Sequence, residues 1–345
     1  MQEITVHAPT RIDLAGGTLD LWPIHQLLPY KSTVNVALNL RASTTLRLGA
    51  LGEPSSLHSS DQQLRCSGSF AELSFFASPP QAAAILPLHR LMLRNLWTAE
   101  LPPLALSSTC TSPQGAGLGG SSSLAITLAS ALGRARQLLD GTPQVAGAAL
   151  VAQAQDIEAH CLHTPTGIQD YWAAVNGGIT HISYPPGAPL IRCYPLAQLP
   201  ELQDEVLICY SGRSRLSGIN NWQIFKGMME GNGVISKLIE EIGYHSEAVS
   251  QALLRGGWQE LLGHSHKEWQ ARRQLGAGIE TEETQRIDQA AGRAGAYFTR
   301  ICGAGGGGVM ALFVPKEKRQ QVAAAAEAAG GVILSAGFTE QGVSI

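Results

Sequence analysis

A glycine- and serine-rich segment in mid-chain has the composition of a polyphosphate-binding loop. It reads Ser112-Pro-Gln-Gly-Ala-Gly-Leu-Gly-Gly-Ser-Ser-Ser123. Its glycines allow the backbone to turn tightly and to approach a ligand without a Cβ atom in the way. The segment leads into a predicted helix, whose unpaired N-terminal amides and dipole favour an anion. The serines add hydroxyls for phosphate oxygens or for a hydrated metal ion.

Three other interpretations of this loop explain less of it. The spacing Gly115-x-Gly117-x-x-Gly120 satisfies the dinucleotide fingerprint, and Asp140 lies at about the expected distance downstream. In that fold the acidic residue ends a second strand, whereas Asp140 ends a predicted helix that another helix follows. A Walker loop is excluded because the segment contains no lysine. A purely structural glycine loop stays open, although it leaves the serine triplet unexplained.

Two further clusters have the residue types of a binding site. Arg11, Asp13 and Asp20 interrupt an otherwise apolar strand and turn near the start of the chain. Charged groups are costly to bury unless they are paired or bind something polar, so these residues indicate a site, with a solvated turn as the alternative. The segment Gly303–Gly308 contains more glycines than a hairpin turn requires, which favours a flexible backbone wall against a ligand.

A carboxylate is predicted on the apolar side of a helix that Thr142 caps and that runs from Pro143 to about Cys161. Spacings of four, three and four align Gly147, Val151, Ala154 and Glu158. We therefore expect Glu158 to point into the protein, where it needs a cation; a solvated glutamate at the helix end is the alternative. Zinc is disfavoured, because the spacing within Glu158–His163 matches no standard finger and offers no fourth ligand.

The predicted elements that carry these residues mix strands and helices without a regular β-α-β alternation. This favours α+β in both halves over a doubly wound sheet. In the first half we predict strands at Ile4–Val6, Ser32–Leu40, Thr44–Leu48 and Pro103–Thr109, and helices at Pro79–Glu100 and Ser121–Leu139. In the second we predict strands at Glu205–Tyr210, Ala296–Ile301, Val309–Val314 and Val332–Leu334, and helices within Asn220–Gly276 and Lys316–Ala329.

Length and composition indicate a globular protein of two domains. A chain of 345 residues exceeds what one hydrophobic core usually serves, and the polar segment Pro195–Gln203 suggests domains 1–200 and 201–345. A formal net charge of −3 without charge runs gives no field to attract nucleic acid or an acidic membrane. No signal peptide or membrane span is visible. Six scattered cysteines are expected to be reduced thiols, which favours a cytoplasmic location.

The order of the three clusters resembles the three motifs of the GHMP kinases. These are a Pro-Thr-Arg motif near the start, Pro-x-Gly-x-Gly-Leu-Gly-x-Ser-Ser in mid-chain and Gly-Ala-Gly-Gly-Gly-Gly near the end. The resemblance covers residues 6 to about 314. Within the family the chain is most similar to bacterial heptose 7-phosphate kinases and to the kinase domain of fucokinase, on Leu14–Asp20, Gly167–Tyr171, Tyr210–Ser214 and His266–Arg272. The resemblance implies an α+β, two-domain GHMP kinase fold, with an N-terminal ribosomal-S5-domain-2-like domain and a C-terminal ferredoxin-like domain.

The resemblance implies an ATP- and Mg²⁺-dependent kinase with assigned roles along the chain. Asp170 matches the catalytic aspartate, and Arg11 would lie against it and hold it ionised. Ser121 and Glu158 would hold Mg²⁺. The ATP phosphates would be wrapped by Pro113, Gly115, Gly117, Leu118, Gly119, Gly120, Ser121, Ser122 and Ser123.

The same resemblance implies a sugar or sugar phosphate as acceptor, phosphorylated at its anomeric hydroxyl. Its contacts would be Thr18, Asp20, Asp170, Gly303, Ala304, Gly305 and Gly306. Arg213 and Arg215 are candidate clamps for a phosphate on the acceptor, with solvated loop residues as the alternative. The chain departs from the heptose kinases, which commonly read Gly-Gly-Gly-Thr-Asp where it has Gly16-Gly-Thr-Leu-Asp20. A homodimer is compatible with the sequence.

Two other functions compete with a sugar kinase. A GHMP kinase for a non-sugar alcohol, such as a mevalonate-like acid or homoserine, would want a cation where this chain has Asp20. A non-catalytic sensor that binds ATP and a partner protein would not need the complete set of Arg11, Ser121, Glu158 and Asp170.

Overall fold

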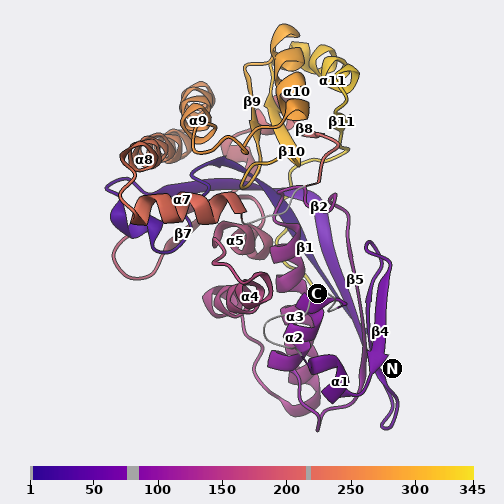
Figure 1. The fold of residues 1–345 in the computed structure, drawn as a ribbon. Helices are drawn as coiled ribbons and strands as arrows, with labels where there is room; N and C mark the ends of the chain where they lie inside the picture. The colour runs from indigo at the N-terminus through magenta and orange to yellow at the C-terminus, as the bar shows by residue number, and fades with distance from the viewer. Residues whose placement is uncertain (1–2, 76–84, 215–218) are drawn as a thin grey trace.

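A computed structural model describes residues 3–75, 85–214 and 219–345 of the chain. Within these residues the strands form two sheets, each covered by helices, in an elongated molecule (Figure 1). The larger sheet has the order β4-β3-β5-β2-β6-β7, with β1 paired to β2. The smaller sheet has the order β11-β8-β10-β9. The mixed architecture with two sheets confirms the predicted α+β class.

The larger sheet and its helices take up the first part of the chain. Its strands are β1 (Glu3–Ala15), β2 (Ser32–Leu48), β3 (Ser55–Ser59), β4 (Leu64–Gly68), β5 (Leu104–Cys110), β6 (Ile179–Ser183) and β7 (Leu190–Tyr194). The helices that go with it are α1 (Phe70–Ser74), α2 (Pro87–Leu96), α3 (Gly120–Asp140), α4 (Gly147–Leu162) and α5 (Gln169–Asn176). Figure 1 shows these helices gathered on one side of the long strands.

The smaller sheet lies at the other end of the molecule (Figure 1). Its strands are β8 (Val206–Tyr210), β9 (Phe298–Ile301), β10 (Val309–Phe313) and β11 (Val332–Ile333). The helices of this second part of the chain are α6 (Leu202–Glu205), α7 (Ile219–Met229), α8 (Gly233–Arg255), α9 (Trp258–Arg272), α10 (Glu282–Arg293) and α11 (Arg319–Ala328), of which α8 also packs on β2 of the larger sheet. The predicted strand pair around Gly303–Gly308 is confirmed, because β9 and β10 pair antiparallel across it.

Strand β1 brings charged residues into the interior. Its first half alternates buried and partly exposed positions, as a half-covered strand should, but every residue from Ala8 to Ala15 is buried. Register shifts against β2 fall between Pro9 and Thr10 and between Asp13 and Ala15. Such irregularities bend a strand and redirect its side chains. They flank the segment that contains Arg11 and Asp13.

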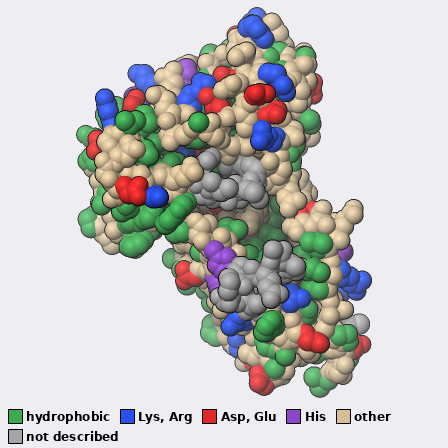
Figure 2. Space-filling model, in the orientation of Figure 1, with side chains coloured by type: hydrophobic (Ala, Val, Ile, Leu, Met, Phe, Trp, Pro, Cys, Tyr) green, Lys and Arg blue, Asp and Glu red, His purple; other side chains and the backbone are tan. Residues whose placement is uncertain are grey.

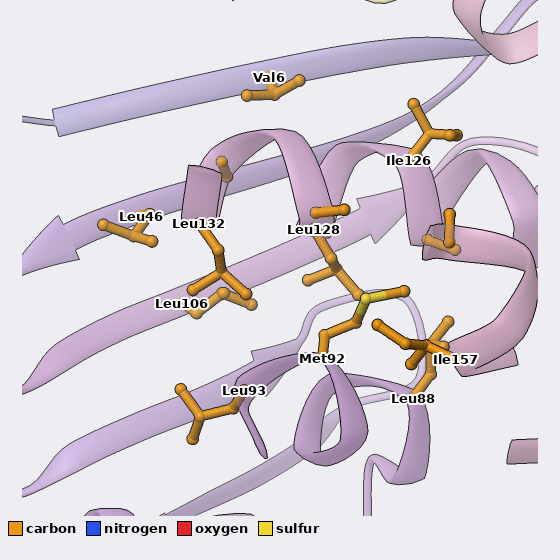
Figure 3. Close-up of a cluster of buried hydrophobic side chains, with 14 of the residues drawn as sticks. Val6, Leu46, Leu88, Met92, Leu93, Leu106, Ile126, Leu128, Leu132 and Ile157 are labelled. Atoms are coloured by element: carbon orange, nitrogen blue, oxygen red, sulfur yellow. The ribbon is translucent and has the colours of Figure 1, made fainter. Parts of the chain in front are cut away.

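Buried apolar side chains pack both within and between the two layers. One cluster fills the space between the larger sheet and α2, α3 and α4, where Leu128 and Leu132 meet Met92 and Leu106 (Figure 3). A second cluster joins the two sheets, since it contains side chains of β1 and β2 together with those of β8, β10, α8 and α9. The smaller sheet is therefore packed firmly onto the strand that carries Arg11.

The end of the chain returns to the larger sheet. Isolated bridges join Phe338 to Leu38 and Ser344 to His7. The division of the chain at residue 200 stays a prediction, and this tail extends from the smaller sheet onto the larger one. Figure 2 shows the surface hollowed between the two ends of the molecule.

Several predicted boundaries were wrong. The helix expected from Pro143 begins at Gly147, because residues 142–146 run alongside α3, where the amide of Thr142 bonds to Asp140 and Gln144 contacts the carbonyl of Ser130. The strands expected at Ser32–Leu40 and Thr44–Leu48 form one strand, β2. Of the helix expected at Pro79–Glu100, residues 79–84 lie outside the described residues and the rest contains the shorter α2.

Two further properties bear on the predictions. All six cysteines are thiols, as expected. Among the described residues no helix is both long and apolar enough to cross a membrane.

Candidate active site

A partly buried ion pair joins Arg11 of β1 to Asp170 at the start of α5. The Arg11 Nε atom donates to Asp170 Oδ1 at 2.7 Å, and Nη2 makes a second contact with the same oxygen. The side chain of Arg11 is 4% exposed and that of Asp170 is 23% exposed. Burial alone would lower the pKa of Arg11, but the carboxylates of Asp170 and Asp13 outweigh it and hold the pKa above its usual value. The predicted contact between these residues is thus present.

Arg11 also fixes the glycine-rich loop before α3. Its Nη1 atom donates to the carbonyl of Gly117 at 2.8 Å, and its backbone amide donates to the carbonyl of Leu118. Gly119, with φ +74°, caps the helix, and a Cβ there would lie 3.0 Å from Asp170 Cγ. Only glycine combines this backbone conformation with the close approach. The positive end of α3 therefore lies beside the Asp170 carboxylate.

Glu158 lies inward, as the helical stripe predicts, and meets the first turn of α3. Its carboxylate is buried and accepts hydrogen bonds from the hydroxyls of Tyr171, at 2.6 Å, and of Ser121 and Ser122. Burial raises the pKa of Glu158, and these hydrogen bonds oppose the rise. In the described part of the chain no recorded ion pair links Glu158 to a basic side chain. A buried carboxylate beside a serine hydroxyl fits Mg²⁺, which prefers oxygen ligands and keeps several waters.

The third serine of the loop has a different environment. The hydroxyl of Ser123 is fully buried and donates to the carbonyl of Pro9 at 2.7 Å. This bond ties α3 to β1, so within the serine triplet only the hydroxyls of Ser121 and Ser122 bond to Glu158. Among the three serines of the loop, the described contacts take Ser123 to Pro9 and not to that carboxylate.

Asp20 lies next to Asp170, at the end of the turn that follows β1. Its Oδ2 atom accepts from the backbone amide of Gln169 at 3.1 Å. A Cβ on Gly167 would collide with this carboxylate, so glycine is required there. Burial, and then the charge of Asp170, raise the pKa of Asp20 to about 6. Thr18, with φ +75°, is held in the same turn by Arg272.

The second glycine-rich loop closes against the first. The amide of Val309 donates to the carbonyl of Ala116 at 2.7 Å, and a Cβ on Gly308 would overlap this carbonyl. Gly303, Gly305 and Gly306 have φ between +70° and +86°, a range that favours glycine. Four of the predicted acceptor contacts, Gly303 to Gly306, thus lie in a loop whose far end borders the glycine-rich loop before α3.

Of the two arginines predicted to bind a phosphate on the acceptor, Arg213 lies within the described residues and Arg215 does not. The carbonyl of Arg213 accepts from the amide of Gly308 at 2.9 Å, so its backbone borders the glycine loop. Its guanidinium is exposed and lies 3.5 Å from Glu283 of α10. No recorded contact brings this guanidinium to Asp20 or Asp170 within the described ranges. Arg215 lies outside the described residues.

Several residues of this region were missed by the sequence analysis. Tyr171 holds Glu158, and Gln169 holds Asp20 through its backbone amide. Arg272, Glu268 and Arg300 are buried behind the turn that carries Thr18. The pairing of Glu268 and Arg272 one helical turn apart was a readable signal, whereas nothing local marked Arg300 as buried. The zinc alternative gains no support, since no three metal-ligating side chains converge within the described ranges.

Comparisons with known proteins identify two matching sequence families. Residues 85–178 match the GHMP kinases N terminal domain, and residues 249–332 match the GHMP kinases C terminal domain. The chain is 24% identical over 308 residues to the L-fucokinase/L-fucose-1-P guanylyltransferase of Bacteroides fragilis, a match that covers 81% of this chain and 31% of that protein. The chain thus spans about a third of the length of this curated relative.

Solved structures share the fold along nearly the whole chain. A D-glycero-D-manno-heptose 1-phosphate kinase from Bacteroides thetaiotaomicron superposes with a TM-score of 0.75 at 18% identity, covering 99% of this chain and 98% of that one. The galactokinase of Lactococcus lactis, complexed with galactose, gives 0.75 at 15% identity, with 99% and 95% covered. The mevalonate kinase of Methanococcus jannaschii gives 0.73 at 15% identity, with 98% and 99% covered.

The raised pKa of Asp20 predicts a pH-dependent cost to folding. The folded-state pKa of about 6 lies above the ordinary value of 3.8, so the folded protein binds this proton more tightly than the unfolded chain does. Ionisation of Asp20 therefore destabilises the fold as pH rises from about 4 to 7, by at most roughly 3 kcal/mol. The Asp20→Asn variant cannot ionise at this position and should not lose this stability. The free energy of unfolding of Asp20→Asn minus that of the wild type should therefore increase as pH rises from about 4 to 7. Urea titrations across the range measure the difference, and a constant difference would contradict the assignment.

Proposed function

The chain belongs to the GHMP kinase family, and from this premise we propose that it is a sugar kinase that transfers the γ-phosphate of ATP to a sugar hydroxyl. The observation that carries this proposal is the Arg11–Asp170 pair, which lies beside the N-terminus of α3 and next to Asp20. One small region thus offers a helix end for phosphate, a partly buried base and a second carboxylate for hydroxyl groups.

At the donor end, the glycine loop and the first turn of α3 would bind the ATP phosphates. The left-handed glycines let backbone amides face an anion at close range. Ser121 and Glu158 would hold Mg²⁺, which when bound neutralises charge on the polyphosphate. The proposal needs no metal ligands from the protein other than Ser121 and Glu158.

At the centre, Asp170 would accept or orient the proton of the attacking hydroxyl. Arg11 keeps the Asp170 carboxylate in one place through two contacts. Phosphoryl transfer depends mainly on such positioning. A positioned base contributes about 10²–10⁴-fold in general. Arg11 is held in turn by two carbonyls of the phosphate loop, so the base and the donor site share one support.

At the acceptor end, Asp20 would accept hydrogen bonds from two adjacent hydroxyls of a sugar. We propose a pyranose phosphorylated at its anomeric hydroxyl, such as a heptose, a heptose 7-phosphate or a related sugar. A non-sugar alcohol that carries its own carboxylate would face repulsion from Asp20 and Asp170. A non-catalytic sensor would not need Glu158 buried beside Ser121. We also propose a cytoplasmic location, from the six thiols, and a homodimer.

Asp170→Asn tests the proposed base. Loss of the negative charge should reduce kcat by at least about a hundredfold, while the affinity for ATP stays close to wild type because the phosphate loop is a separate segment. ADP formation on a panel of free sugars and sugar phosphates gives kcat, and equilibrium titration with ATP gives the affinity. A variant that keeps a substantial part of kcat would show that Asp170 is not the base. A wild-type enzyme inactive on every sugar, but active on another alcohol, would refute the acceptor.

Glu158→Gln tests the proposed metal site. The amide keeps the size of the side chain but removes the negative charge, so Mg²⁺-dependent turnover should weaken more than binding of metal-free ATP. The activity is measured by titrating Mg²⁺ at fixed ATP. Glu240→Gln, an exposed glutamate on α8, is the matched control and should leave the Mg²⁺ titration unchanged. The same Mg²⁺ dependence in Glu158→Gln and wild type would exclude Glu158 as a metal ligand.

Arg213→Ala tests the proposed clamp for an acceptor phosphate. If Arg213 leaves Glu283 to bind that phosphate, the variant should raise KM for the phosphosugar by about tenfold and leave KM for the free sugar unchanged. The comparison needs one sugar in both forms. Equal KM changes for both forms would mean that Arg213 binds no acceptor phosphate.

A further inference from the structure

Four buried charged residues from three elements meet behind the candidate active site. They are Asp13 of β1, Glu268 and Arg272 of α9 and Arg300 of β9, and none is more than 3% exposed. Arg300 lies at the centre. Its Nη2 atom donates to Asp13 Oδ2 at 2.6 Å and lies 3.2 Å from Glu268 Oε2. Glu268 in turn accepts from Arg272 at 2.6 Å.

One end of this cluster holds the turn that carries Thr18 and Asp20. Glu268 Oε1 accepts from the backbone amide of Gly16 at 3.0 Å. Arg272 donates to the carbonyl of Gly17 and to the hydroxyl of Thr18. A Cβ on Gly17 would lie 2.9 Å from the Arg272 guanidinium, so the turn lies flat against it.

The other end of the cluster holds the second glycine-rich loop. Asp13 Oδ1 accepts from the backbone amide of Gly303, the first residue of that loop, at 3.1 Å. Burial by itself would raise the pKa of Asp13, but the charges of Arg300, Arg272 and Arg11 outweigh it and keep the pKa well below its usual range. Asp13 is therefore ionised and accepts from Arg300 and Gly303 at once.

The cluster is not arranged for stability alone. Buried ion pairs are often no more stabilising than apolar residues of the same volume, because removing charges from water is costly. Arg300 Nε has no hydrogen-bond partner among the described residues, and Glu268 Oε2 meets Arg300 as an ion pair without an aligned hydrogen bond, although both atoms are buried. Such incomplete satisfaction calls for an explanation other than packing.

We propose that Arg300 is a positioning residue that couples the acceptor turn, Gly16–Asp20, to the glycine loop, Gly303–Gly308. Through Glu268 it fixes the turn, and through Asp13 it fixes the first residue of the loop, so the two walls keep one spacing. The role in catalysis rests on the proposed function, in which these walls bind acceptor and phosphate. The coupling itself does not, and hydrogen exchange tests it without turnover.

Glu268→Gln and Asp13→Asn break the cluster at opposite ends. Glu268 contacts the amide of Gly16, and Asp13 contacts the amide of Gly303. Each variant should increase amide exchange by at least about threefold at both Gly16 and Gly303, because residues in one network are energetically coupled. Arg300→Lys, which keeps the charge, should increase exchange at both positions less than Arg300→Met does. Glu260→Gln on α9, the helix that carries Glu268, is the control. It breaks only the exposed pair with Arg255, at 2.7 Å, and should leave amide exchange at Gly16 and Gly303 unchanged.

Amide exchange in β5 serves as the internal reference, because faster exchange there marks general destabilisation of the fold. In that case the increase at Gly16 and Gly303 is compared after division by the increase in β5. Increased exchange at the far peptide supports the coupling. A change confined to the directly contacted peptide in both variants would overturn it.

Kinetics on the identified sugar provide the second measurement. Glu268→Gln should raise KM for the acceptor, Asp13→Asn should lower kcat, and KM for ATP should change by less than about twofold in both. The double variant should lose less kcat/KM than the product of the two single losses, by about tenfold. Losses that multiply fully would refute the catalytic role. An inactive wild type would refute the proposed function, while the exchange result would still decide the coupling.

Discussion

The arrangement of the site depends on one buried arginine. Arg11 is nearly inaccessible to water, so all of its donors must find partners inside the protein. They find Asp170 on α5 and carbonyls of the loop before α3. The carboxylate of Asp170 on one helix and the glycine-rich loop that starts another are thereby held to the same strand. A shift of α5 would weaken the pairing of the buried Arg11 charge, and a shift of the loop would leave Arg11 donors or loop carbonyls without partners, which is costly.

Close backbone contact is the second constraint on the site. Gly119 lies against Asp170, Gly167 lies against Asp20, and Gly308 lies against the carbonyl of Ala116. At each position a Cβ atom would push apart two segments that must touch. The glycines therefore do more than supply flexible turns, since they set the distance between the two loops and the carboxylates. The apolar cluster shared by the two sheets holds these contacts in place.

The carboxylates of the site differ because their surroundings differ. Asp13 is surrounded by three arginines, which hold its pKa low, whereas Asp20 is buried next to another carboxylate and has its pKa raised to about 6. Glu158 is buried with hydroxyl groups as its hydrogen-bond partners, an environment that a divalent cation would complete. The three acidic side chains thus have three different surroundings, which match the loop contact of Asp13 and the roles proposed for Asp20 and Glu158.

The sequence by itself determined the features that depend on neighbouring residues. The glycine-rich loop that leads into α3, the second glycine-rich loop between β9 and β10 and the inward direction of Glu158 follow from local composition and helical spacing. Most strands and helices were predicted for the same reason, and the start of α4 was wrong because a good local capping signal lost to packing against α3. Only the tertiary structure decided which distant charges meet. Asp13 and Arg300 are 287 residues apart, and Arg11 and Asp170 are 159 apart. It also turned Ser123 toward Pro9 and Arg213 toward Glu283. A side chain's type states what it can bind, but the folded chain decides which partner is within reach.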